Sequence, residues 1–255
     1  MAEITARDIK LFRVISLGVS TLGMIMSFLN DAFGIKITKY AIEKRLSILR
    51  AGDYITSRKY SRINKHGHIT LYSLTKKSVS VITCLGRPVE QIRYGLPEDL
   101  MALHELAVTQ TLYALALESL QGLYEVKFED SAVLKQRRKK GSRDLIPDLY
   151  LELTFKDGHK TIMNIEIDMG TIISHKMVNR LRKPSRTDVF TLIFCTSEPR
   201  INRLREECRK TYIYHPELVY FALQKDFRER GFRGTKVVSI KGESAYLTLY
   251  EEKND

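Results

Sequence analysis

Two short runs of alternating residues limit what this chain can fold into more than any other feature of its sequence. Apolar side chains recur at every second position from 149 to 155 and again from 163 to 169. A period of two is typical of a half-buried strand. Asp157 and Gly158 between the runs are typical of a tight turn. The segment therefore predicts a β-hairpin with one apolar face.

Helix and strand patterns on both sides of this hairpin extend the prediction to a mixed fold. A long helix is expected at 97–122 and a strand at 123–128. After the hairpin we expect a helix at 172–182 and an apolar strand at 189–195. The predicted order is helix, three strands, helix, strand, so the fold class is α+β or α/β.

Basic charge is concentrated in the first third of the chain. Residues 1–95 hold 16 Lys and Arg against 6 Asp and Glu, whereas residues 96–255 hold 26 against 24. This asymmetry indicates that the first third contacts a polyanion such as DNA. No apolar run approaches the roughly 18 residues of a spanning helix, and three scattered cysteines suit a reducing compartment. We expect a cytoplasmic protein without a membrane partner.

The first third has the pattern of a winged helix-turn-helix, with three short helices and a basic hairpin. Ile42, Leu46 and Leu49 mark the buried side of the third helix. In such a domain this helix enters the major groove while the hairpin holds phosphates. The residues expected in the groove are Lys39, Tyr40, Glu43, Lys44 and Ser47, and those expected on the DNA backbone are Arg58, Lys59, Arg62 and Lys65. The alternative is that these charges only solvate a small helical domain.

Glycine and proline between the two patterns place the predicted domain boundary. We expect a DNA-binding domain at 1–85, a linker at 86–97 and a second domain at 98–255. The second domain contains a strongly basic loop at 135–143, which is either a phosphate clamp or a solvated loop. The phosphate contacts expected from this loop are Arg137, Arg138, Lys139 and Lys140.

Three acids around the hairpin are the candidate catalytic and metal-binding residues. Glu166 and Asp168 lie on the face opposite the apolar side chains. A two-residue turn would place Asp148 opposite Ile167 and away from the acids, whereas a three-residue turn at 157–159 would place it opposite Asp168. Only the longer turn keeps both apolar runs on one face, so we expect it. Three converging carboxylates would hold Mg²⁺; the alternative is that they are solvated.

The motifs around these acids resemble those of the replication-relaxation family, which is associated with plasmid mobilisation and replication. The resemblance rests on Pro147-Asp148, on the Glu-x-Asp-x-Gly-Thr run at 166–171, and on Lys176 in the following helix. His104 resembles the helical His of that family. The family's members start with a winged-helix region, which matches the pattern of the first third.

The same arrangement is similar to the αβββαβ core of the PD-(D/E)xK nucleases. The resemblance implies that Asp148 and Glu166 hold a metal while a lysine orients the attacking water. Asp168 stands where that lysine is expected, and a carboxylate cannot donate a hydrogen bond to the developing charge. Lys176 could supply the missing cation or could only contact phosphate. Glu105 could join the metal shell, although His104 beside it has the pattern of a core residue.

Two functions are consistent with these residues. The first is a double-stranded DNA-binding homodimer of a plasmid or other mobile element, acting in mobilisation or replication with a relaxase or other mobilisation protein. Its nuclease-like domain would be degenerate in catalysis. The second is a Mg²⁺-dependent nicking endonuclease using Asp148, Glu166 and Lys176, with Asp168 as a further metal ligand. The absent motif lysine favours the first.

Overall fold

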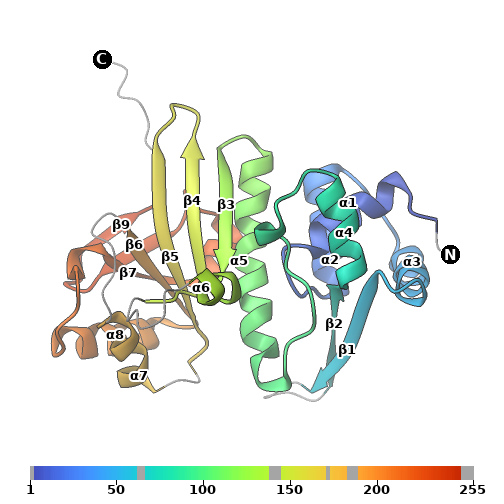
Figure 1. Cartoon of the computed structure of the whole chain (residues 1–255). Helices are drawn as coiled ribbons and strands as arrows, with labels where there is room; N and C mark the ends of the chain where they lie inside the picture. Colours follow the sequence, from blue (N-terminus) through green and yellow to red (C-terminus); the bar gives the residue numbers. More distant parts are fainter. Residues whose placement is uncertain (1–2, 62–66, 138–144, 171–172, 183–188, 248–255) are drawn as a thin grey trace. The chain divides into compact units, whose positions relative to one another are not determined.

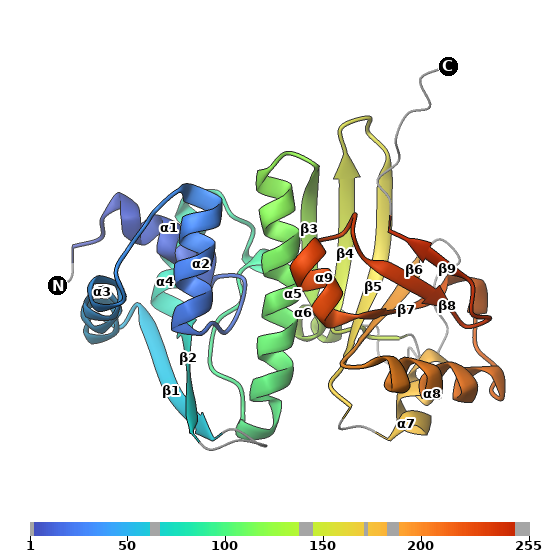
Figure 2. The same cartoon turned by 180° about the vertical axis from the view of Figure 1, so that it is seen from behind.

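The computed structural model describes residues 3–61, 67–137, 145–170, 173–182 and 189–247. The chain divides into two compact units, Met1–Tyr113 and Ala114–Asp255, whose elements are labelled in Figures 1 and 2. The division falls inside the long helix α5 (Ala102–Leu120).

The first unit has the predicted order of three helices and a hairpin. Its elements are α1 (Ala6–Ile15), α2 (Leu22–Phe33), α3 (Lys39–Ala51), β1 (Ile55–Ser61), β2 (His68–Leu74) and α4 (Lys76–Cys84). Strands β1 and β2 pair antiparallel. Ser20, between α1 and α2, forms a bridge to Tyr72 of β2, so a third extended segment joins the hairpin.

Threonine caps and one buried ion pair hold these helices. Thr5, Thr21 and Thr38 each precede a helix and accept a hydrogen bond from a backbone N–H of its first turn. Arg45 of α3 reaches Asp8 of α1, with 2.7 Å between Nε and Oδ1. Because Asp8 also completes the capping box with Thr5, one carboxylate fixes both the start of α1 and its position on α3.

The residues predicted as a linker have contacts within the first unit. Ile92 is buried, and the backbone N–H of Arg93 donates to the carbonyl of Ser16 at 2.8 Å. Short 3-10 helices form at Val89–Gln91 and Asp99–Met101. The first turns of α5 belong to a core cluster of this unit that contains Val19, Tyr60, Leu71, Ala102 and Leu106.

The second unit is built on a mixed sheet, with seven strands in the described residues. They are β3 (Tyr124–Asp130), β4 (Leu149–Phe155), β5 (Lys160–Asp168), β6 (Phe190–Cys195), β7 (Val219–Leu223), β8 (Lys236–Ser239) and β9 (Ser244–Tyr246), in this spatial order. Strands β5, β6 and β7 are parallel, and the other neighbours are antiparallel. The fold is therefore mixed α/β, and its first strands have the predicted order.

Four shorter helices accompany this sheet. They are α6 (Ser131–Arg137), α7 (Ser174–Leu181), α8 (Glu198–Arg209) and α9 (Gln224–Arg230), and a 3-10 turn forms at Pro216–Leu218. Helix α6 forms where the sequence predicted the start of the basic loop. Figures 1 and 2 both show α7 beside α8 at one end of the strands.

The hairpin register differs from the prediction by two residues. Leu149 pairs with Ile165, and the N–H of Phe155 donates to the carbonyl of His159. The turn does have three residues, but they are 156–158, with Gly158 in the left-handed region at φ +83°. The predicted pairing of Asp148 with Asp168 is therefore wrong, because the turn closes one residue earlier than expected. Continued to Asp148, this register brings that residue opposite Glu166.

Helices α7 and α8 cover the sheet face on which the acids lie. Ile193 and Cys195 of β6 pack in one core cluster with residues of α7 and α8. In the parallel register Glu166 is beside Ile193 and Asp168 is beside Cys195, so both acids share that face. Phe194 points to the opposite face and contacts Phe227 of α9. The acids therefore lie beneath helices rather than on an open face.

One helical segment in the described residues, 99–120, is long and apolar enough to cross a membrane. This test uses only length and composition. Half of the apolar stretch that meets this test is buried inside the protein.

Candidate functional site

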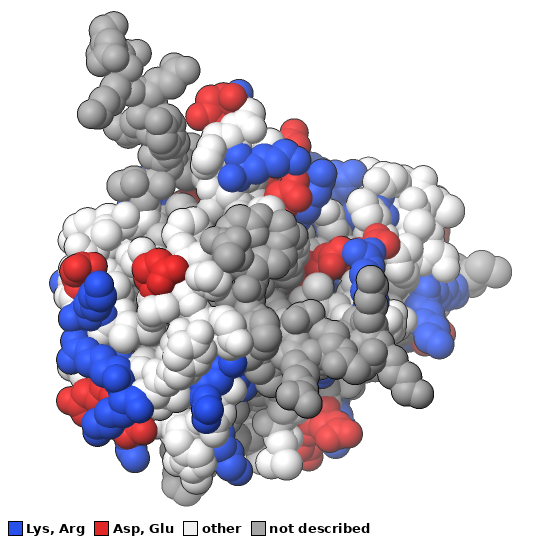
Figure 3. Space-filling view, turned by 60° about the vertical axis from the view of Figure 1, so that its left-hand side comes forward, with Lys and Arg blue, Asp and Glu red and all other residues white. Residues whose placement is uncertain are grey.

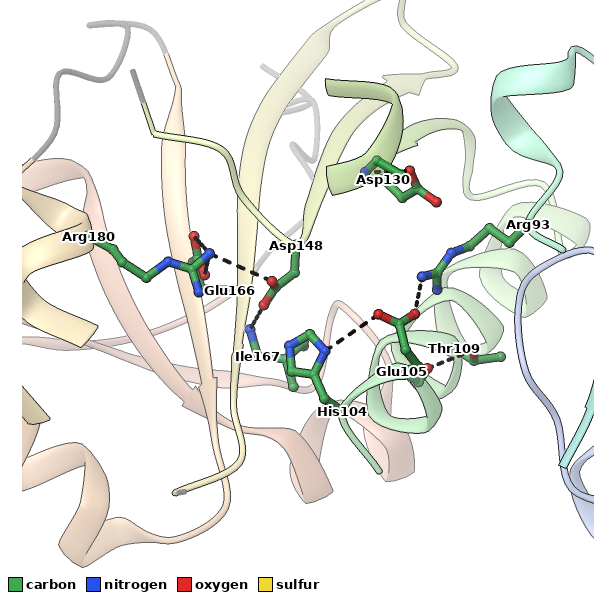
Figure 4. Close-up of polar contacts among 10 residues, drawn as sticks. Arg93, His104, Glu105, Thr109, Asp130, Asp148, Glu166, Ile167 and Arg180 are labelled. Atoms are coloured by element: carbon green, nitrogen blue, oxygen red, sulfur yellow. Dashed lines mark hydrogen bonds and ion pairs between the residues drawn. The ribbon is translucent and has the colours of Figure 1, made fainter. Parts of the chain in front are cut away.

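Two of the three predicted acids share one arginine of α7. Nη2 of Arg180 lies 2.8 Å from Oε2 and 3.0 Å from Oε1 of Glu166, and 3.7 Å from Oδ1 of Asp148. The same nitrogen donates to the carbonyl of Ile146 at 3.2 Å. Figure 4 shows the Arg180 side chain directed at both acids. Glu166 is fully buried, so this guanidinium supplies charge that water cannot.

Asp148 also completes the hydrogen bonding of β5. Its Oδ2 accepts the backbone N–H of Ile167 at 2.7 Å, as drawn in Figure 4. Because β4 begins only at Leu149, the carboxylate takes the place of a neighbouring strand's carbonyl at the end of the ladder. The Pro147-Asp148 motif therefore has a structural role in addition to its electrostatic one.

The third acid, Asp168, has an arginine of its own. Nε of Arg200 in α8 lies 2.6 Å from Oδ2 of Asp168, and Nη2 lies 3.1 Å from Oδ1. Arg200 also donates to Oγ of Ser174 at 2.9 Å. The hydrogen bond to Asp168 raises the pKa of the guanidinium further above its ordinary value. This is a bidentate, charge-assisted pair with both side chains largely buried.

The expected Mg²⁺ does not fit this arrangement of charges. Guanidinium nitrogens already occupy the positions next to the oxygens of Glu166 and Asp168. Among the described residues, no group of three or more His, Cys, Asp or Glu side chains could hold a metal ion. Two fixed cations thus offset most of the charge that a divalent metal would otherwise have to balance.

Lys176, the predicted catalytic lysine, lies elsewhere on α7. It is exposed, and no hydrogen bond or ion pair in the described part of the chain connects it to the acids. Arg180, one helical turn further on, contacts them instead. The sequence motifs indicate no role for Arg180 or Arg200. The sequence did contain a signal for Arg200. Asp168 ends β5 and Arg200 follows β6, and because parallel strands end at the same edge of a sheet, the two residues are expected near one another.

His104 and Glu105 belong to a polar cluster of the first unit. Arg93 donates to Oε2 of Glu105, and Nδ1 of His104 lies 3.7 Å from Oε1. Burial alone would raise the pKa of Glu105, but the hydrogen bond from His104 and the charge of Arg93 hold it below its usual value. Figure 4 shows both partners around this carboxylate.

The polar face of α3 is exposed as the sequence predicted. Ile42, Leu46 and Leu49 are buried in the first unit. Because these three residues set the rotation of the helix, the five residues expected in the DNA groove lie outward: Lys39, Tyr40, Glu43, Lys44 and Ser47. Lys39 and Glu43 form a loose pair at 3.9 Å. Tyr40 is 73% exposed, which is unusual for an aromatic side chain in a small domain.

The hairpin offers fewer free cations than its sequence suggests. Arg58 pairs with Asp99 at 2.8 Å and lies over the ring of Tyr60. Lys59 is exposed. Arg50 of α3 is a further cation beside the hairpin, one that the sequence pattern did not indicate. Its Nη1 donates to Oγ of Ser57 in β1. Arg62 and Lys65, also expected on the DNA backbone, lie outside the described residues.

Most of the predicted phosphate clamp also lies outside the described residues, namely Arg138, Lys139 and Lys140. Arg137 ends α6 and forms an ion pair with Glu129 of β3. This residue is therefore anchored on the sheet of the second unit.

Comparison with known proteins identifies the family. The family model of replication-relaxation proteins matches residues 16–186. This chain belongs to the replication-relaxation family. The match begins directly after α1 and ends beyond α7, so in this replication-relaxation protein it includes the hairpin, Asp148, Glu166 and Arg180. The resemblance inferred from the sequence motifs is thus confirmed.

Among solved structures, the protein is similar to PadR of Bacillus subtilis, crystallised in complex with operator DNA. The sequence identity is 17% and the TM-score is 0.30, with 54% of this chain and 82% of that chain covered. No curated protein matches the chain.

Proposed function

We propose that this replication-relaxation protein binds double-stranded DNA through its first unit and acts in replication or mobilisation of a plasmid or other mobile element. The observation that carries the proposal is the exposed polar face of α3 beside the β1–β2 hairpin. In a winged helix such a helix reads base edges in the major groove, and the hairpin holds phosphates. Family membership supports the replication context.

Lys44→Ala tests this assignment. DNA binding of the full chain would be measured by fluorescence anisotropy over a series of salt concentrations. Removing one cation from the groove-facing side of α3 should weaken binding several-fold and reduce the slope of log K against log salt by about one. Lys127→Ala on β3 removes the same charge from the second unit and should leave that slope unchanged. Equal effects of the two variants would contradict the proposed role of α3.

For the second unit we propose a nuclease-like domain without catalytic activity, which positions DNA or recruits a relaxase or other mobilisation protein. Support comes from the order of its first elements and from the engagement of Glu166 by Arg180 and of Asp168 by Arg200. A nuclease needs its carboxylates free to bind metal. A protein that recruits or bends DNA only needs them held in place.

A nicking assay separates this proposal from the enzymatic alternative. Supercoiled plasmid would be incubated with the wild-type protein or Asp148→Ala and with Mg²⁺ or Mn²⁺, and we expect no relaxed product. Nicking that disappears in Asp148→Ala would instead support the alternative, a metal-dependent endonuclease in which Asp148 acts together with Glu166 and Lys176. We also propose that the protein is a homodimer, because a DNA site with two-fold symmetry matches a protein with two-fold symmetry. Sedimentation of the full chain measures its oligomeric state.

A further inference from the structure

Two tyrosines are exposed directly after α8. Tyr212 is 70% exposed and Tyr214 is 37% exposed, and their ring centroids lie 5.3 Å apart in an edge-to-face contact. Ile213 between them is buried in the core cluster of α7 and α8. Because the buried Ile213 fixes the backbone between the two tyrosines, both rings are held on the solvent-exposed side of this segment.

The tyrosines line a hollow of about 650 Å³ whose opposite wall is the turn after β8. Two arginines of α8 hold this turn by its backbone. Nε of Arg205 donates to the carbonyl of Ser239, and Nε of Arg209 donates to that of Ile240, each at 3.0 Å. The hollow is therefore formed by fixed walls before any ligand arrives.

The border of the hollow is charged. Lys241 lines the hollow, and Lys210 lies in the chain between two lining residues, Arg209 and Thr211. Both lysines are exposed, and in the described part of the chain no ion pair engages either ammonium group. The nearby carboxylate of Glu217 lies 3.3 Å from Nδ1 of His215. Figure 3, which turns one side of the molecule forward, shows Lys and Arg interspersed with acids rather than a continuous basic patch. Glu217 and Glu243 line the hollow together with Arg209 and Lys241, so charge alone would give it only weak affinity for a polyanion.

We propose that the hollow binds single-stranded nucleic acid, with bases stacking on Tyr212 and Tyr214 and phosphates contacting Lys210 and Lys241. Stacking on exposed aromatic rings beside cations is how proteins bind single strands without reading sequence. A protein partner would instead be expected to cover tyrosines set in a wider apolar patch, and these rings are bordered by charged residues. The inference deepens the proposed DNA function by adding a single strand to the duplex bound by the first unit.

The test is binding of a labelled 15-nucleotide oligothymidylate to the full chain, measured by anisotropy beside an abasic oligomer of equal length and charge. The wild type should bind the oligothymidylate at least tenfold more tightly than the abasic strand. Tyr212→Ala/Tyr214→Ala should lose about tenfold or more of that affinity. Tyr212→Phe/Tyr214→Phe, which keeps the rings, should bind within about twofold of the wild type.

Tyr246→Ala is the matched control, because Tyr246 is an exposed tyrosine of β9 outside this hollow, and it should bind like the wild type. Equal binding of the abasic strand, or equal loss in the control, overturns the inference. Failure of the wild type to bind the oligothymidylate also overturns the inference and would instead indicate that the tyrosine pair contacts a protein partner. Duplex binding measured on the same samples reports separately on the proposed function.

Discussion

Arg180 forms an ion pair with the fully buried carboxylate of Glu166, with 2.8 Å between Nη2 and Oε2. The same guanidinium lies 3.7 Å from Asp148. An arginine thus bridges the two acids that the nuclease resemblance assigned to a metal. Arg180 and Arg200 therefore balance part of the negative charge on this face.

Arg180→Ala should therefore destabilise the protein. Removing the guanidinium leaves Glu166 charged and buried, and we expect a loss of about 3 kcal/mol in the free energy of unfolding. Adding Glu166→Gln should recover part of that loss, because the neutral side chain needs no counter-ion. Urea denaturation measures both. Lys176→Ala, one turn earlier on the exposed side of α7, should change the unfolding free energy by less than about 0.5 kcal/mol.

Asp148→Ala should weaken the start of the β4–β5 pairing. It removes the acceptor for the N–H of Ile167, and an unpaired buried N–H costs about 1–3 kcal/mol. Asp148→Asn keeps an oxygen acceptor and should lose less. Hydrogen exchange at the Ile167 amide would be faster in Asp148→Ala than in Asp148→Asn. Equal exchange rates in the two variants would show that Asp148 does not cap this amide.

Gly231→Ala should destabilise the protein by more than backbone strain alone explains. Gly231 has φ +72°, and an added Cβ would lie 2.2 Å from Oε1 of Glu118. That carboxylate accepts the N–H of Phe232 at 2.9 Å and the hydroxyl of Tyr124 at 2.7 Å, so it cannot move without losing both bonds. Gly158 has φ +83° and open space around its Cα. Gly158→Ala should therefore lower the melting temperature less than Gly231→Ala.

The ion pair of Asp8 with Arg45 should make the first unit sensitive to acid. Burial alone would raise the pKa of Asp8, but hydrogen bonds from Arg45 and Thr5 bring it below the ordinary 3.8. A carboxyl whose pKa is lower in the folded state stabilises the fold above its unfolded pKa and loses that effect as the pH falls through its folded pKa. Asp8→Asn should cost about 2 kcal/mol at pH 7. The difference between wild type and variant in urea denaturation should shrink below about pH 4, and a constant difference would contradict the assignment.

Much of the fold could be read from local patterns. The spacing of Ile42, Leu46 and Leu49 correctly predicted which face of α3 is buried. The alternation around Leu149 and Ile165 correctly predicted the hairpin and the shared face of Asp148 and Glu166. Both depend only on the geometry of one element, and the sequence records that geometry directly. Short motifs around the hairpin also predicted the family.

The partners of the acids could not be read in the same way. The hairpin register depends on where the turn closes, and the difference between a turn at 157–159 and one at 156–158 moved Asp148 from Asp168 to Glu166. Whether Lys176 or Arg180 reaches the acids depends on how α7 packs on the sheet.

The sequence by itself therefore determined the kinds of element, their buried faces and the residue types available for chemistry. Only the tertiary structure decided that Arg180 and Arg200, from helices that follow β5 and β6, neutralise those acids. The physical reason is that periodicity is a property of neighbouring residues, whereas an ion pair across 14 or 32 residues exists only once side chains have packed and excluded water.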